Sequence, residues 1–116
     1  MKSSKTWQTE IINIAKQYVI EPNGGEYEKS DIEKMINSKK IDGDLIAYLC
    51  EYLAYSVTNK YGDDLAVDEI VDKMKSQSKK EAYVKLENYE DSRKEITDLI
   101  IQGLQKGLKK NPNFPE

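Results

Sequence analysis

The sequence predicts an all-α protein: a single-domain bundle of five to six helices packed around a central apolar helix at about residues 43–61. Apolar residues recur at steps of three and four along most of the chain, which is the spacing of one helix face. Residues that start or stop helices separate these segments, and strand signals are weak throughout. At 116 residues the chain has room for one hydrophobic core, so we expect one domain over residues 1–116.

The first two helices are predicted from their apolar faces and their ends. Trp7 and Ile11 begin an apolar face that continues to about residue 20, before a turn rich in proline and glycine. A shorter helix is expected from Ser30 to about residue 38, because Ser30 and Glu33 have the spacing of a capping box.

The segment from about residue 43 to residue 61 is the most apolar in the chain. Leucines share one arc of this helix, Ala47 and Ala54 lie almost opposite, and tyrosines fill much of the remainder. A helix that is apolar nearly all round is normally covered on several sides. We therefore place it at the centre of the domain, with Cys50 as a buried small hydrophobe.

Two helices are expected next. Asp63 and Asp64 offer N-caps for a fourth helix, whose buried side would include Val67 and Ile70. The segment 76–78 predicts a break, after which Ser78 and the glutamate three residues later form a capping box for a fifth helix.

The last helix ends before Pro112, and residues 111–116 are expected to form a flexible tail. A capping signal at Ser92 leaves open whether residues 78–110 form one helix or two. Gly103 and Gly107 lie on the apolar face of this helix and predict the close approach of another helix, with the alanines of the central helix as a candidate counterpart. The alternative is a seam for self-association, so we expect a monomer or a weak homodimer.

Catalytic and metal-binding motifs are missing. The chain has no histidine and one cysteine, so the usual general base, the commonest zinc ligand and the usual nucleophile pairs are absent. No glycine-rich phosphate loop or calcium loop occurs. We therefore expect neither an enzyme nor a bound metal or cofactor.

Apolar runs are too short to span a membrane and a lone cysteine forms no internal disulfide, so a cytoplasmic protein is expected.

Charge is unevenly distributed along the chain. Residues 31–72 carry ten acidic side chains and four lysines, a net charge of −6, whereas residues 73–86 carry +4. An acidic surface repels the phosphates of nucleic acids and attracts basic proteins. The expected partner is therefore a basic protein.

The central helix and the acids after it supply the candidate binding surface. Tyrosine gives large, rigid contact area at small entropic cost, and carboxylates pair with lysine or arginine of a partner. In size, charge and helicity the chain is similar in kind to the cytosolic immunity proteins and antitoxins that neutralise bacterial toxins, many of them basic nucleases. The residues expected to bind the partner are Tyr48, Glu51, Tyr52, Tyr55, Asp63, Asp64 and Asp68.

A nucleic-acid-binding regulator is the alternative function. Residues 65–87 have the outline of a helix-turn-helix, with basic residues on its second helix. Against this alternative, the turn lacks the usual glycine and the whole chain is acidic, so nucleic acid is the less favoured partner. The residues it would use are Lys79, Lys80, Tyr83 and Lys85.

Overall fold

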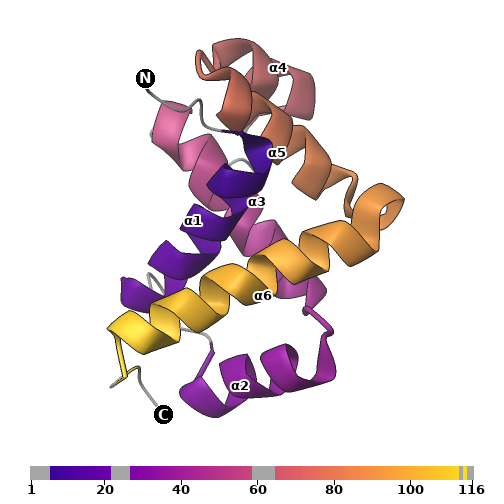
Figure 1. Cartoon of the computed structure of the whole chain (residues 1–116). Coiled ribbons are helices and arrows are strands. Elements are labelled where there is room, and N and C mark those ends of the chain that lie inside the picture. The colour runs from indigo at the N-terminus through magenta and orange to yellow at the C-terminus, as the bar shows by residue number, and fades with distance from the viewer. Residues whose placement is uncertain (1–5, 22–26, 59–64, 113, 115–116) are drawn as a thin grey trace, which may run out of the picture.

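A computed structural model describes residues 6–21, 27–58, 65–112 and 114. Within these ranges the chain forms six α-helices and one short 3₁₀ helix, without a strand, and together they make one compact globule (Figure 1). The predicted all-α bundle is confirmed. The elements are α1 (Trp7–Ile20), α2 (Lys29–Ser38), α3 (Gly43–Thr58), α4 (Val67–Lys73), α5 (Gln77–Glu87), η2 (Tyr89–Ser92) and α6 (Arg93–Lys110).

Three of the helix starts differ from the predicted ones. In α2 the Asp31 carboxylate accepts a hydrogen bond of 3.0 Å from the backbone N–H of Glu28, so this helix begins one residue before Ser30. In α5 the cap is Ser76, whose hydroxyl accepts from the backbone N–H of Lys79. At α4 the Glu69 side chain accepts from Ala66 N–H at 2.9 Å, and the predicted caps at positions 63 and 64 lie outside the described residues.

Ser78 is not the cap of α5 because its hydroxyl is used elsewhere. It donates a hydrogen bond of 2.7 Å to the carboxylate of Glu10 on α1, and both side chains are buried. A buried carboxylate is costly unless it is hydrogen-bonded. This bond therefore ties the start of α5 to α1 through a polar contact inside the core.

The closest helix pair is α1 with α6, which cross as neighbouring helices in Figure 1. A Cβ atom built on Gly103 would lie 2.3 Å from the carbonyl oxygen of Ile12 and 2.6 Å from Cβ of Ala15. One built on Gly107 would lie 2.6 Å from Cβ of Val19. The two glycines thus permit close approach, as predicted. The proposed counterpart was wrong, since they face α1 and not the alanines of α3.

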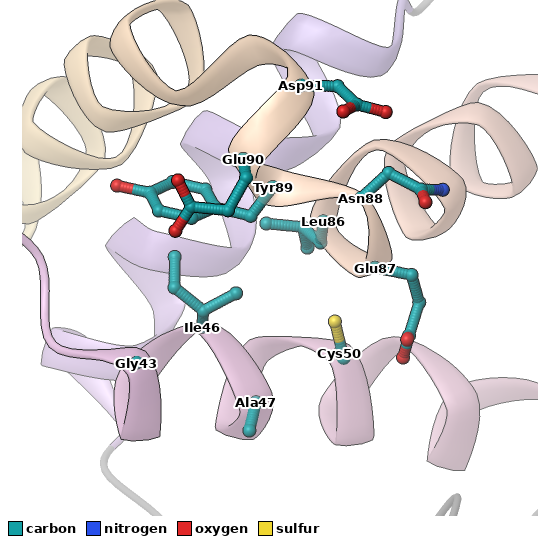
Figure 2. A pocket seen from close by; sticks show the side chains of 10 residues that line it. All are labelled: Gly43, Ile46, Ala47, Cys50, Leu86, Glu87, Asn88, Tyr89, Glu90 and Asp91. Atoms are coloured by element: carbon teal, nitrogen blue, oxygen red, sulfur yellow. The ribbon is translucent and has the colours of Figure 1, made fainter.

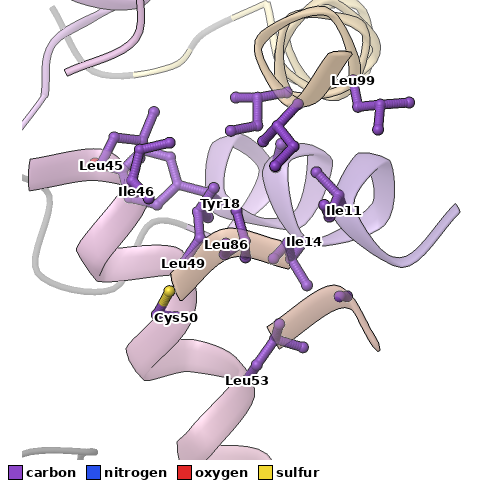
Figure 3. Close-up of a cluster of buried hydrophobic side chains, with 14 of the residues drawn as sticks. Ile11, Ile14, Tyr18, Leu45, Ile46, Leu49, Cys50, Leu53, Leu86 and Leu99 are labelled. Atoms are coloured by element: carbon purple, nitrogen blue, oxygen red, sulfur yellow. The ribbon is translucent and has the colours of Figure 1, made fainter. Parts of the chain in front are cut away.

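All six α-helices contribute to one hydrophobic core, and Figure 3 shows the part where α1, α3, α5 and α6 meet. Helix α3 packs against α1, α4 and α5, while α1 packs against α3, α5 and α6. Cys50 is buried, as predicted. The outward side of α3 is not covered, however, and Ala47, Tyr52 and Tyr55 are exposed there. The core residues that α3 contributes are Leu45, Ile46, Leu49, Cys50, Leu53 and Ala54.

The segment 78–110 forms two helices. Helix α5 ends at Glu87 and is capped by Asn88, whose side-chain amide donates to the carbonyl of Val84 at 2.9 Å. The 3₁₀ turn η2 follows and redirects the chain into α6. A hydrogen bond between the hydroxyls of Tyr89 and Thr97 fastens this corner to α6.

Residues 111, 112 and 114 are held against the bundle. Phe114 is 1% exposed and its ring centroid lies 6.5 Å from that of Tyr18. The Asn111 amide donates to the carbonyl of Val19 at 3.0 Å, and Lys29 Nζ donates to the carbonyl of Pro112 at 3.2 Å. These contacts involve residues 111, 112 and 114, and the flexibility expected for residues 111–116 as a whole stays a prediction.

Candidate protein-docking surface

Helix α3 presents aromatic side chains on its outward side. The leucines of the opposite side enter the core, and this orients the polar and aromatic positions outward. Tyr52 is 37% exposed and Tyr55, one turn further along, is 47% exposed. Glu51 is half-buried beside them. Three of the predicted partner-binding residues thus reach the surface on one side of one helix.

Tyr48 belongs to the edge of the core. Its ring meets that of Tyr18 edge to face, with 5.1 Å between the ring centroids and an angle of 81° between the planes. Tyr18 is buried and also meets Tyr27 edge to face. Burial, with the nearby carboxylates of Asp42 and Asp44, raises the pKa of Tyr27 to about 12. Tyr48 is therefore half-buried within an aromatic cluster, unlike the two tyrosines that follow it.

Helix α4 adds acidic side chains beside the end of α3. It packs against α3, and Asp68 is exposed together with Glu69 and Asp72. Val67 was predicted to be buried but is 43% exposed, whereas Ile70 and the C-cap residue Met74 are buried and Val71 is partly buried against the core. Asp63 and Asp64, the other predicted acids, lie outside the described residues.

A groove borders the outward side of α3 at its N-terminal half (Figure 2). Its volume is about 470 Å³. Its apolar lining comes from Ile46 and Ala47 on α3 and Leu86 on α5, and the Cys50 sulfur points into it. Glu87, Glu90 and Asp91, all exposed, stand on the α5–η2 side.

The sequence-based site did not include these three acids. They are separated from the end of α3 by roughly thirty residues of chain, and only the fold brings them opposite it. Glu87 also raises the pKa of two buried groups. Burial, and secondly Glu87, raise the pKa of the Cys50 thiol well above its ordinary value. The same two causes, in the same order, raise the pKa of the Tyr83 hydroxyl.

The residues of the nucleic-acid alternative do not share one exposed face. Tyr83 is 3% exposed and packs in the core. The Lys85 ammonium lies over the ring of Trp7, 4.9 Å from its centroid. Lys79 and Lys80 are half-buried. The exposed positions of α5 also include two glutamates, Glu81 and Glu87, so its surface is of mixed charge.

No known protein family, curated protein or solved structure matches this chain. Within the described ranges, no three carboxylate or thiol side chains are grouped so as to hold a metal ion. In the same part of the chain, none of the helices combines the length and the apolar character needed to cross a membrane.

Proposed function

We propose that this chain is a protein-binding module that docks a basic partner protein through the outward side of α3 and the acids of α4. The observation that carries the proposal is the exposure of Tyr52 and Tyr55 one turn apart on an otherwise well-packed helix. Exposed tyrosines are favoured at protein interfaces because they supply contact area with few rotatable bonds.

The charges beside the tyrosines define the partner. Glu51, Asp68, Glu69 and Asp72 lie on α3 and α4, and the segment 31–72 has a net charge of −6. Such a surface speeds association with a basic protein and disfavours acidic competitors. A basic toxin domain, such as a nuclease, fits this chemistry. The module would then act as an immunity or antitoxin-type inhibitor in the cytoplasm, by occupying the toxin, and this role needs neither catalysis nor a cofactor.

Affinity capture tests the proposal directly. The wild-type chain and a Tyr52→Ala/Tyr55→Ala variant are immobilised and exposed to lysate from the source organism, and retained proteins are identified by mass spectrometry. We expect one basic protein on the wild-type chain. Once purified, this partner should bind the double variant at least about tenfold more weakly than it binds the wild type. The reason is that tyrosines that are hot spots of an interface contribute about 2 kcal/mol or more to the binding free energy.

The matched control is Val84→Ala, which truncates an exposed apolar side chain on α5. Its affinity should equal that of the wild type. Circular dichroism and urea unfolding should show that all three proteins are folded. An unchanged affinity in the tyrosine variant, or retention of acidic proteins only, would contradict the proposed function.

A further inference from the structure

We infer that the groove between α3 and the α5–η2 corner receives an arginine or lysine side chain from a partly apolar segment of the partner protein. The inference rests on the proposed function, because it names the chemistry that the partner presents at one end of the same docking surface. The occupant is defined by the shape of the groove, its charge and its position.

The groove has a low apolar wall on the side of α3. Gly43 and Ala47 lie one turn apart, and no atom lies within 4 Å of the position where a Cβ of Gly43 would stand. Ile46 and Leu86 close the bottom. A volume of about 470 Å³ admits a few side chains of a docked segment. The floor offers no charged group to pair with, so it suits aliphatic carbon.

The opposite wall is acidic. The groove is lined by Glu87, Glu90 and Asp91, and none of the residues that line it is basic. Glu90 forms an ion pair of 3.9 Å with Arg93, and both of these side chains are largely exposed to solvent. An ion pair so exposed is weak and easily replaced. The carboxylates are therefore accessible to a cation from outside.

An aliphatic floor beside an acidic wall matches the two parts of a lysine or arginine side chain. The stem of such a side chain packs on apolar surface while the charged head reaches polar groups at the rim. Arginine fits best, because its planar guanidinium can pair with two carboxylates at once. An acidic or purely apolar segment would leave the carboxylates unpaired as it displaced their water.

The groove is continuous with the tyrosine side of α3. Gly43, Ala47, Glu51 and Tyr55 follow one another at four-residue steps, which places them along the same side of the helix. Glu51 also lies close enough to Cys50 to contribute to the raised pKa of that buried thiol. A partner seated on the exposed tyrosines therefore extends naturally into the groove.

A random library of twelve-residue peptides displayed on phage provides the probe. It is selected against the folded wild-type chain, and the enriched peptides are synthesised with a fluorophore for anisotropy titration. We expect enrichment of peptides with arginine or lysine next to aliphatic residues. Their affinity should fall at least tenfold in Glu87→Gln/Asp91→Asn and should be unchanged in Glu81→Gln, which neutralises an exposed acid of α5 outside the groove.

Two further variants separate the groove from the proposed function. Ala47→Trp fills the groove from an exposed position and should abolish peptide binding while the chain still unfolds cooperatively in urea. Peptides that need Tyr52 and Tyr55 but tolerate the groove variants would overturn this inference and leave the proposed function standing. Three other results would also overturn the inference about the groove. These are enrichment of neutral or acidic peptides, no enrichment at all, and occupation of the groove by a second copy of this chain.

Discussion

Glu87 is the residue that links the groove to the buried interior. Its carboxylate is exposed to solvent, yet it lies close enough to Cys50 and Tyr83 to raise the pKa of both buried groups, second in effect only to burial. A thiol in this environment stays protonated at neutral pH. Since the thiolate is the reactive form, Cys50 should be a slow nucleophile.

The reaction of Cys50 with iodoacetamide tests this environment, and Cys50 is the only thiol in the chain. In the wild type the alkylation rate should keep rising with pH through pH 10, without the plateau that an ordinary thiol shows above its pKa of about 8.5. Glu87→Gln removes a negative charge, so the thiol pKa falls and the thiolate fraction rises about tenfold for each pKa unit recovered. Mass spectrometry of the alkylated chain gives the rates.

The control for this experiment is Glu81→Gln, an exposed substitution on the same helix whose carboxylate does not perturb Cys50. It should leave the alkylation rate unchanged. A wild-type rate that levels off near pH 9, or equal rates in the two variants, would show that Glu87 does not control the thiol.

Residue-scale burial was the least predictable property of the candidate site. Helical spacing places Tyr48, Tyr52 and Tyr55 on the same broad side of α3, but it carries no information about the helix that lies beside them. Tyr18 of α1 covers Tyr48 and leaves the other two exposed. The predicted burial of Val67 was wrong for a different reason. Helix α4 has only seven residues, and of these it buries Ile70 while Val67, at its start, stays exposed.

At the scale of elements, the glycines of α6 have the largest structural consequence. They let the backbone of α6 approach α1, and a methyl group at Gly103 would meet the carbonyl oxygen of Ile12. A backbone atom cannot rotate away as a side chain does. The helices would have to separate, and this would loosen the apolar contacts on either side.

Gly103→Ala should therefore destabilise the protein although alanine is the better helix former. Overpacking costs about 1–3 kcal/mol in general, and a clash with a backbone atom belongs to the upper part of that range, about 2–3 kcal/mol. Helix propensity returns only about 1 kcal/mol. We expect a net loss of roughly 1–2 kcal/mol in the free energy of unfolding, measured by urea titration. Gly43→Ala is the matched control, since nothing lies within 4 Å of its added methyl group, and it should be neutral or slightly stabilising.

An equal stability of Gly103→Ala and the wild type would mean that α1 and α6 do not pack as closely as described.

The existence of the helices, and the approximate ends of most of them, followed from periodicity and from cap residues. The partner of the glycine face did not, because a helical wheel identifies a face but not what covers it. The cap of α5 moved from Ser78 to Ser76 for a related reason: Ser78 is bonded to Glu10, a residue distant in sequence.

At the scale of the whole molecule, the fold brings acidic side chains from four elements to the docking side. The docking side combines α3 with the acids of α4, η2 and the end of α5, whereas Lys106, Lys109 and Lys110 are exposed at the far end of α6. Lysines at a helix C-terminus interact favourably with the helix dipole. The charge imbalance was visible in the sequence, but the contribution of residues 87–91 to the acidic side required the fold.

Phe114 adds a buried ring to the core beside Tyr18 of α1. Phe114 is almost fully buried and approaches Tyr18, the ring that also supports Tyr48 and Tyr27. Two hydrogen bonds hold the residues just before it: the Asn111 amide donates to the carbonyl of Val19, and Lys29 donates to the carbonyl of Pro112. Phe114 thus extends the aromatic cluster of Tyr18, Tyr27 and Tyr48.

Phe114→Ala should therefore be strongly destabilising, even though it changes a residue close to the chain end. Truncation of a buried phenylalanine costs about 3–5 kcal/mol, which is a large part of the 5–15 kcal/mol that holds a typical domain folded. A chain of this size should lose roughly 10 °C or more in its melting temperature, as followed by circular dichroism. Pro112→Ala alters an exposed neighbour and leaves the carbonyl that binds Lys29, so it should melt close to the wild type. If the two variants melted at the same temperature, Phe114 would not be part of the core.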